Sequence, residues 1–208
     1  MLKIDAPAAG SGDWTVPAGN FDAYIFDCDG TLAETMRVHY AAWLLAVRNQ
    51  TGSAFHLEWS VFCSMGGMST RDTLDALQAR YGVALDEARL RTDVEKRLAE
   101  TLDTAGARPE ALALARSAAS AGIKLAVASG GHRRHVERTL QNIGATDLFP
   151  VVVTLDDVSR AKPAPDLFLL AARRLGVPPA ACLVIEDSPL GLAAAQAAGM
   201  RCLLVEPR

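Results

Sequence analysis

Short apolar runs separated by helical patterns are the feature of this sequence that most restricts its fold. The runs have no polar residue at alternate positions, which is typical of strands buried on both faces of a parallel sheet. Between them, apolar residues recur at helical spacing, as in Phe168, Ala171 and Leu175. Strand and helix repeated in this order predict an α/β fold with a doubly wound parallel sheet. The expected strands are Ala23–Phe26, Leu125–Ala128, Val151–Val153, Cys182–Ile185 and Cys202–Val205.

One long interval breaks this alternation. Between about residues 34 and 105 the sequence shows helical apolar stripes and no convincing strand. An insertion of this kind directly after the first strand predicts a helical subdomain that covers the sheet. We expect residues 1–33 and 105–208 to form the α/β core and residues 34–104 to form a helical cap. The stripes are Val38, Ala41, Ala42 and Leu45; Leu74, Leu77 and Tyr81; and Leu90, Val94 and Leu98.

The composition restricts the partners that this protein could use. With 21 basic and 24 acidic residues the net charge is −3, so no surplus of positive charge indicates nucleic-acid binding. No apolar stretch is long enough to span a membrane, and the N-terminal residues lack the apolar segment of a secretory signal. The four cysteines show no metal-ligand spacing, which favours reduced thiols in a cytoplasmic protein. A monomer is the default expectation.

Polar side chains follow four of the expected strands. Ligands of open α/β sheets bind outside the carboxyl ends of the strands, so these side chains are expected to meet at one edge. Asp156 and Asp157 follow the third strand as further carboxylates. The main candidates are Asp27 and Asp29 after the first strand, Ser129 and Gly130 after the second, Lys162 after the third, and Glu186 and Asp187 at the fourth.

Asp27 and Asp29 are two residues apart, so both carboxylates point the same way from an extended segment. Adjacent anions repel each other unless a cation lies between them, and oxygen ligands favour Mg²⁺ over Zn²⁺. Glu186 and Asp187 would complete a Mg²⁺ site. An EF-hand loop is excluded because Val38 would stand at its last position, where Glu is needed. A plain exposed turn fits poorly with the apolar run directly before it.

Two further features indicate phosphate binding. Ser129-Gly130-Gly131 precedes a predicted helix, where backbone N–H groups and the helix N-terminus can converge on an anion. Lys162, held extended before Pro163, could neutralise a phosphate beside the acidic residues. For Ser129-Gly130-Gly131 an ordinary turn is the alternative. For Lys162 a solvated loop lysine is the simpler alternative, and the neighbouring acidic residues decide against it. No GxGxxG or GxxxxGK[ST] string supports nucleotide binding.

The order of these motifs resembles the haloacid dehalogenase superfamily of aspartate-nucleophile phosphatases. The helical insertion after the first motif is similar to the cap of the subgroup that contains β-phosphoglucomutase and small sugar-phosphate phosphatases. The resemblance covers residues 21–206, and its motifs are much more specific for the superfamily than for a substrate. The matching motifs are Asp27-x-Asp29-Gly30-Thr31-Leu32, Ser129, Lys162-Pro163 and Glu186-Asp187.

The resemblance implies a Mg²⁺-dependent phosphatase that hydrolyses a small phosphorylated metabolite, such as a sugar phosphate, through an aspartyl-phosphate intermediate. In this mechanism Asp27 is the nucleophile and Asp29 the general acid–base. Asp29 also excludes the dehalogenase branch, which lacks this acid–base residue and needs no metal. The implied Mg²⁺ ligands are Asp27, the backbone carbonyl of Asp29, Asp187 and Glu186, and the implied phosphate-binding residues are Ser129, Gly130 and Lys162.

Substrate choice is expected to lie in the cap. His39 aligns with a histidine that positions the acid–base Asp in the mutase-like subgroup, with a satisfied polar residue on a helix as the alternative. In the cap loop, Thr70 stands where the mutase pattern has Arg, and Arg71 either replaces that arginine or is solvated. This departure favours hydrolysis over a phosphomutase of the β-phosphoglucomutase type, which stays the alternative. Asp29 argues against a phosphate-sensing binding protein, and broad house-cleaning activity remains open.

Overall fold

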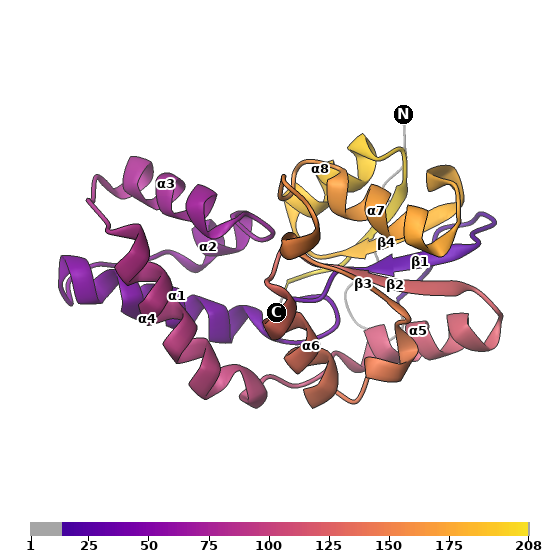
Figure 1. Cartoon of the computed structure of the whole chain (residues 1–208), viewed down its shortest axis with the longest axis horizontal. Helices are drawn as coiled ribbons and strands as arrows, with labels where there is room; N and C mark the ends of the chain where they lie inside the picture. Colours follow the sequence, from indigo (N-terminus) through magenta and orange to yellow (C-terminus); the bar gives the residue numbers. More distant parts are fainter. Residues whose placement is uncertain (1–13, 208) are drawn as a thin grey trace.

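A parallel five-stranded sheet forms the centre of the fold (Figure 1). The computed structural model describes residues 14–207; residues 1–13 and 208, which the sequence assigns to the core, lie outside the described residues. The strand order is β3-β2-β1-β4-β5, so the chain builds outward from β1 and then crosses to its other side. The order therefore reverses between β1 and β4, where doubly wound sheets bind ligands. The predicted fold class is confirmed. The strands are β1 (Ala23–Phe26), β2 (Lys124–Ala128), β3 (Val151–Val153), β4 (Cys182–Glu186) and β5 (Arg201–Leu204).

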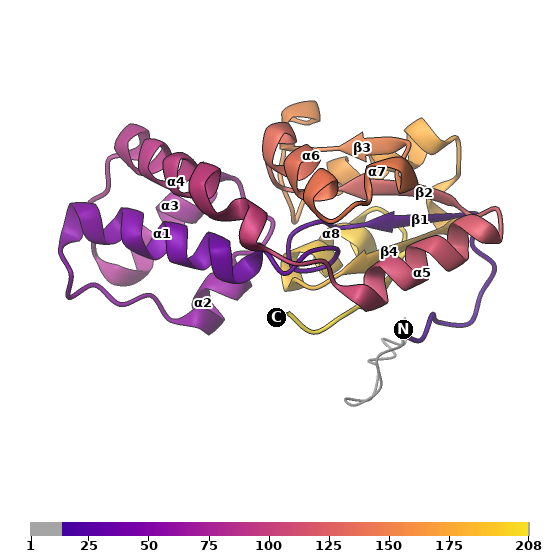
Figure 2. The same ribbon diagram turned by 90° about the horizontal axis from the view of Figure 1, so that it is seen from below.

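Helices cover both faces of the sheet, which explains the apolar runs without polar alternation (Figures 1 and 2). Successive residues of β1 enter different cores: Ile25 belongs to the cluster formed with α7 and α8, and Phe26 to the cluster formed with α5 and α6. Both side chains are fully buried. These helices are α5 (Pro109–Ser120), α6 (Arg133–Asn142), α7 (Asp166–Leu175) and α8 (Pro189–Ala197).

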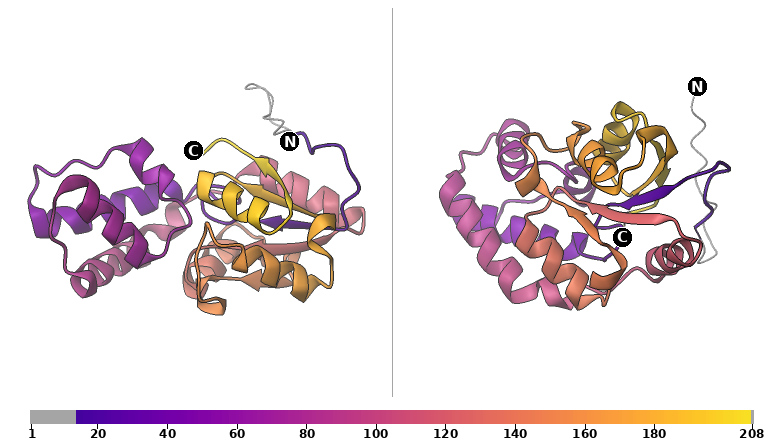
Figure 3. Two further views of the ribbon diagram at one scale, coloured as in Figure 1. Left: turned by 90° about the horizontal axis from the view of Figure 1, so that it is seen from above. Right: turned by 45° about the vertical axis from the view of Figure 1, so that its right-hand side comes forward.

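A second group of helices lies beyond the carboxyl ends of the strands, and the arrow of β1 points toward it (Figures 1 and 3). We call this group the helical cap. It has an apolar cluster of its own, in which Leu57, Leu77 and Leu90 are fully buried. Its helices are α1 (Met36–Thr51), α2 (Trp59–Ser64), α3 (Thr70–Tyr81) and α4 (Glu87–Thr101).

The predicted apolar stripes agree with the cap helices in part. The stripe predicted for α4 is buried along its whole length. In α1, however, Leu45 is 39% exposed, whereas Trp43 and Ala46 are buried. Positions 43 and 45 lie about 200° apart around a helix, so burying the large Trp43 side chain turns Leu45 outward. The prediction that Leu45 belongs to the buried stripe is wrong for this reason.

Two antiparallel segments connect the sheet to the cap. Ala33 forms an isolated antiparallel bridge with Ala107, and the backbone N–H of Arg108 donates to the carbonyl of Leu32 at 2.8 Å. The segment that leaves the sheet and the segment that returns to it therefore lie side by side. The predicted boundaries at 33/34 and 104/105 lie at this connection, and the division into two domains stays a prediction.

None of the helices within residues 14–207 has the length and apolar character that crossing a membrane requires. The four cysteines are free thiols, and Cys28 and Cys182 are buried.

Leu77 and Leu45 provide a matched test of the cap core. We expect Leu77→Ala to lower the free energy of unfolding by about 2–5 kcal/mol, because it removes buried methyl groups and leaves a cavity. Leu45→Ala, on the exposed side of α1, should cost under about 1 kcal/mol. Urea denaturation followed by circular dichroism measures both values, and equal losses would contradict the described packing of α1 and α3.

Candidate active site

The carboxyl ends of β1 and β4 bring three carboxylates together where the strand order reverses. Phe26 pairs with Ile185 in the parallel register, and the backbone N–H of Asp27 donates to the carbonyl of Ile185 at 2.9 Å. One carboxylate oxygen each from Asp27, Glu186 and Asp187 lie within 4.8 Å of one another, and all three residues are buried. The register of two neighbouring strands thus assembles the acidic cluster that the motifs predict.

Lys162 enters this cluster from the loop before α7. Its Nζ donates to Oδ1 of Asp27 at 2.5 Å and to Oε2 of Glu186 at 3.1 Å. Burial opposes the charge of this side chain, but the two carboxylates favour it, and the pKa of Lys162 lies above its ordinary value. With 1% of its surface exposed, Lys162 is not a solvated loop residue.

Three buried carboxylates face one lysine, which leaves a surplus of negative charge. Burial and then Glu186 raise the pKa of Asp27 well above its ordinary value. The same two causes raise the pKa of Asp187 to about 7. A cluster of oxygen donors whose charge is not balanced suits a hard divalent cation. The residues present therefore fit the Mg²⁺ ion that the sequence predicts.

Asp29 lies beside the cluster, but the start of the cap holds it. Its Oδ1 accepts a hydrogen bond from Oγ1 of Thr35 at 2.7 Å and lies 3.2 Å from Nε2 of His39. Oγ of Ser129 lies 3.5 Å from its Oδ2. Burial alone would raise the pKa of Asp29, but His39 and Thr35 outweigh it and lower this pKa to about 2. Two aspartates in one motif therefore have opposite electrostatic environments.

The turn after Asp29 lies between Asp187 and the buried side chain of Arg108. Gly30 has a φ of +87°, and a Cβ there would lie 2.1 Å from Oδ2 of Asp187, so only glycine fits. Nη1 of Arg108 donates to the carbonyl of Gly30 at 2.6 Å and to that of Glu206 at 2.8 Å. Arg108 therefore orients this peptide. No motif of the sequence indicates it, because a single arginine before a proline in a linker carries no local signal.

The Ser129-Gly130-Gly131 turn connects β2 to α6, and a loop of the cap lies directly on it. Oγ of Ser129 accepts a hydrogen bond from the backbone N–H of Gly131 at 3.0 Å. A Cβ on Gly130 would lie 2.8 Å from the carbonyl oxygen of Gly67, and a Cβ on Gly67 would lie 2.8 Å from Cδ of Lys162. The two glycines thus allow the backbones of the cap and the sheet to touch beside Lys162.

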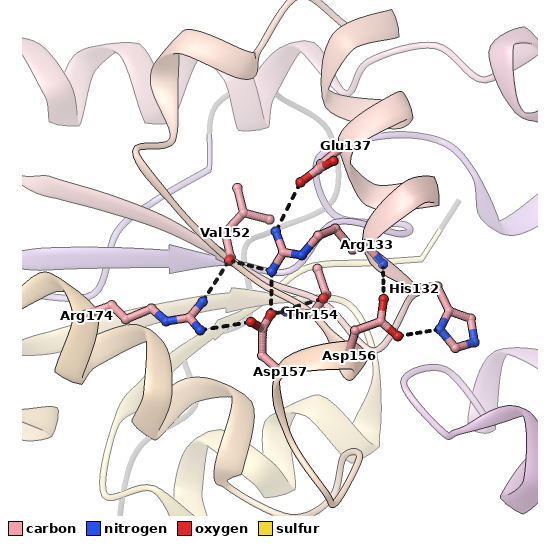
Figure 4. A network of polar contacts seen from close by, with 8 residues as sticks. All are labelled: His132, Arg133, Glu137, Val152, Thr154, Asp156, Asp157 and Arg174. Atoms are coloured by element: carbon pink, nitrogen blue, oxygen red, sulfur yellow. Dashed lines mark hydrogen bonds and ion pairs between the residues drawn. The ribbon is translucent and has the colours of Figure 1, made fainter.

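Asp156 and Asp157, the carboxylates that follow β3, do not join the acidic cluster (Figure 4). Asp156 accepts from the backbone N–H of Arg133 at 2.8 Å and pairs with Nδ1 of His132 at 2.8 Å. Asp157 pairs with Arg133 at 2.6 Å and with Arg174 of α7 at 2.8 Å. Both carboxylates therefore fasten the N-terminus of α6 to the loop after β3.

A cavity lies between the edge of the sheet and the cap, and two of the three predicted cap residues line it. These are His39 and Thr70. Arg71 does not line the cavity: its side chain is 64% exposed and pairs with Asp75 at 3.1 Å and with Glu87 at 2.7 Å. The second of the two alternatives for Arg71, a solvated residue, is the one that this geometry favours.

Asp157 provides a pH-dependent test of the contacts that hold the loop after β3 against α6 and α7. Burial opposes its ionisation, but Arg174, Thr154 and Arg133 lower the pKa of Asp157 from 3.8 to about 2. Because the folded pKa is the lower one, ionised Asp157 stabilises the fold above about pH 4, and this contribution is lost as the pH falls toward 2. We expect Asp157→Asn to lower the midpoint of thermal unfolding at pH 7 and to have a smaller effect at pH 3. The exposed Asp147→Asn is the control, and a loss for Asp157→Asn that stays constant over this range would contradict the assignment.

Comparison with known proteins finds relatives that match most of this chain. Fructose-1-phosphate phosphatase YqaB of Escherichia coli (strain K12) is 33% identical over 177 residues, which cover 85% of this chain and 92% of YqaB. Protein CbbY of Rhodobacter capsulatus is 35% identical over 199 residues, which cover 88% of this chain and 84% of CbbY. The crystal structure of CbbY from Rhodobacter sphaeroides in complex with xylulose-(1,5)bisphosphate matches with a TM-score of 0.76 and 29% identity, over 90% of this chain and 87% of that chain.

A family model described as haloacid dehalogenase-like hydrolase matches residues 21–199, which is most of the chain. As its motifs predict, the protein belongs to the haloacid dehalogenase-like hydrolase family.

Proposed function

We propose that the protein is a Mg²⁺-dependent phosphatase that hydrolyses a small phosphorylated metabolite, such as a sugar phosphate, through an aspartyl-phosphate intermediate. The observation that carries this proposal is the contrast between Asp27 and Asp29. Asp27 lies in the carboxylate cluster beside Lys162, whereas Thr35 and His39 hold Asp29. These two environments support attack by Asp27 and proton transfer by Asp29. The name of the relative YqaB, a fructose-1-phosphate phosphatase, supports the substrate class.

Asp27 would attack the phosphorus atom in line, so that a bond from its carboxylate oxygen forms as the bond to the leaving oxygen breaks. Lys162 holds this carboxylate and places positive charge where phosphoryl oxygens arrive. The hydroxyl of Ser129 and the backbone at Gly130 provide donors at the end of β2. Positioning and charge of this kind are what phosphoryl transfer requires from a protein.

Asp29 would protonate the leaving oxygen and then accept a proton from the water that hydrolyses the intermediate. With a pKa of about 2, Asp29 is ionised in the resting site and carries no proton for the first step. A phosphate group arriving beside Asp29 adds a like charge and raises its pKa, which favours the protonated form needed in the first step. Thr35 and His39 keep the carboxylate in place through both steps.

The residues that would hold Mg²⁺ are Asp27, Asp187 and Glu186, together with the backbone carbonyl of Asp29. When bound, Mg²⁺ supplies positive charge that offsets the repulsion between a carboxylate nucleophile and a phosphate. Glu186 also accepts hydrogen bonds from Lys162 at 3.1 Å and from the backbone N–H of Ser188 at 3.2 Å. These contacts fix the orientation of the cluster.

The cap supports hydrolysis of a small substrate. Its loop lies against Gly130 and Lys162 and so covers part of the phosphoryl site, an arrangement that suits a small substrate better than a phosphoprotein. Thr70 lines the cavity at the position where the mutase pattern has Arg. A phosphomutase of the β-phosphoglucomutase type, the alternative function, therefore has the weaker support.

Asp27→Asn tests the nucleophile. We expect turnover to fall by at least about a thousandfold while the fold is retained, because an amide cannot form the acyl-phosphate. ³¹P NMR with Mg²⁺ and a panel of sugar phosphates measures the release of inorganic phosphate, and circular dichroism checks the fold. Asp22→Asn, the same change just before β1, is the matched control. Turnover retained in Asp27→Asn would contradict the assignment of Asp27 as nucleophile. If the ³¹P signal in the wild-type reaction moves between ester positions of one sugar, the result would support the phosphomutase instead.

Asp187→Asn tests the metal site. We expect the Mg²⁺ concentration for half-maximal activity to rise at least about tenfold, because one charged ligand is lost from the cluster. Asp157→Asn removes a carboxylate of the neighbouring loop and should leave that concentration unchanged. A larger effect of Asp157→Asn would show that the metal site is misplaced; calorimetric titration with Mg²⁺ provides a second measurement without substrate.

A further inference from the structure

The cavity under the cap has an apolar wall on its cap side, and its charged groups are distributed unevenly. On the cap side the wall includes Trp43, Phe62, Met65 and Leu98. Among the described residues that line the cavity, none is an arginine or a lysine. Lys162 reaches Asp27 at the end of the sheet, where the proposed phosphoryl site lies. The lysine charge therefore lies at the sheet end, where it already pairs with Asp27 and Glu186.

Three histidines line the cavity, and each of them already faces a carboxylate. A protonated ring would be neutralised by its own partner. The histidines therefore do not offer free positive charge to a second anionic group of a substrate. The pairs are His39 with Asp29 at 3.2 Å, His132 with Asp156 at 2.8 Å and His135 with Glu95 at 3.1 Å.

Glu95 places a carboxylate on the cap wall of this cavity. It lies on α4, and two residues of the neighbouring α6, His135 and Arg134, form ion pairs with it (Figure 3). Its side chain is 25% exposed, whereas that of Arg134 is 62% exposed and does not line the cavity. Glu95 cannot turn away from the cavity without breaking both ion pairs.

We propose that this cavity selects phosphate monoesters whose leaving group carries no second anionic group, and that Glu95 is the residue that excludes a second phosphate. This inference rests on the proposed phosphatase function and narrows its substrate class. A second phosphate would have to leave water and lie against a cap wall that has no free cation and carries the fixed carboxylate of Glu95. This is unfavourable because burying an unpaired charge is strongly unfavourable. Hydroxyl groups of an uncharged leaving group can instead donate to Glu95, while its carbon atoms pack against Trp43 and Leu98.

The fold itself does not forbid two phosphates. CbbY from Rhodobacter sphaeroides was crystallised in complex with xylulose-(1,5)bisphosphate, and its fold matches this chain with a TM-score of 0.76. The exclusion that we infer therefore comes from the side chains of this cavity, and a bisphosphate is the informative competitor.

The experiment compares two esters that differ only in the second phosphate. Fructose 1-phosphate and fructose 1,6-bisphosphate are one pair, and glucose 1-phosphate and glucose 1,6-bisphosphate are another. For each pair that the wild-type protein hydrolyses, we expect kcat/KM to be at least about tenfold higher for the monoester than for the bisphosphate. Equal or better turnover of the bisphosphate would overturn the inference.

Three variants assign the effect to Glu95. Glu95→Gln should reduce the preference for the monoester by at least about threefold, because it removes the negative charge and releases Arg134. Glu95→Asp keeps the charge and should keep the preference. Asp103→Asn breaks a different ion pair between the end of the cap and α6, the one between Asp103 and Arg138. This pair lies outside the cavity, so the variant should also keep the preference. A preference that is unchanged in Glu95→Gln, or lost equally in Asp103→Asn, would overturn the role of Glu95.

A binding measurement separates this inference from the proposed function. Calorimetric titration of Asp27→Asn with the same esters and Mg²⁺ needs no turnover, and we expect the monoester to bind more tightly. Tighter binding of the bisphosphate would overturn the inference even if the wild-type protein is a phosphatase. Absence of turnover on every ester by the wild-type protein, with monoester binding retained, would instead contradict the proposed phosphatase and leave the charge selection of the cavity supported.

Discussion

The surplus of negative charge buried at the end of β1 and β4 is the constraint on which the rest of the site depends. Asp27, Glu186 and Asp187 cannot all be ionised in a dry environment without partners. The surrounding chain supplies some of them: Lys162 donates to Asp27 and Glu186, and Oγ1 of Thr31 donates to Oδ1 of Asp187. The charge that remains is what makes this edge of the sheet suitable for a divalent cation and for phosphoryl transfer.

The contribution of the cap to the chemistry depends on where its contacts lie relative to the linkers. Thr35 and His39, which hold Asp29, stand at the start of α1, directly after the first linker. Gly67 and Glu95 lie farther along the cap. The contacts that hold Asp29 therefore come from the part of the cap next to its connection to the sheet, and they orient the residue for which we propose the acid–base role.

The parts of the site that strand register assembles could be predicted, and the parts that depend on packing between distant segments could not. Asp27, Glu186 and Lys162 belong to motifs at strand ends, and parallel strands bring such ends together. Arg108 acts on Gly30, 78 positions away, and no local pattern marks that contact. Periodicity identified α1 as a helix but misjudged Leu45, because a period does not say which large side chain takes the buried side.

The distribution of charge along the cavity also bears on the choice between hydrolysis and phosphoryl transfer within one sugar. A mutase that works through a bisphosphate needs to bind that intermediate in two orientations, so each end of its cavity has to accept a phosphate. Here the sheet end has Lys162 and the carboxylates that we propose hold Mg²⁺, whereas the cap end has the carboxylate of Glu95 and, among the described residues that line the cavity, no arginine or lysine. A cavity of this kind favours one orientation, with the phosphate at Asp27 and an uncharged leaving group under the cap. In the mechanism that we propose, the acceptor left for the aspartyl-phosphate in that orientation, once the alcohol has departed, is water.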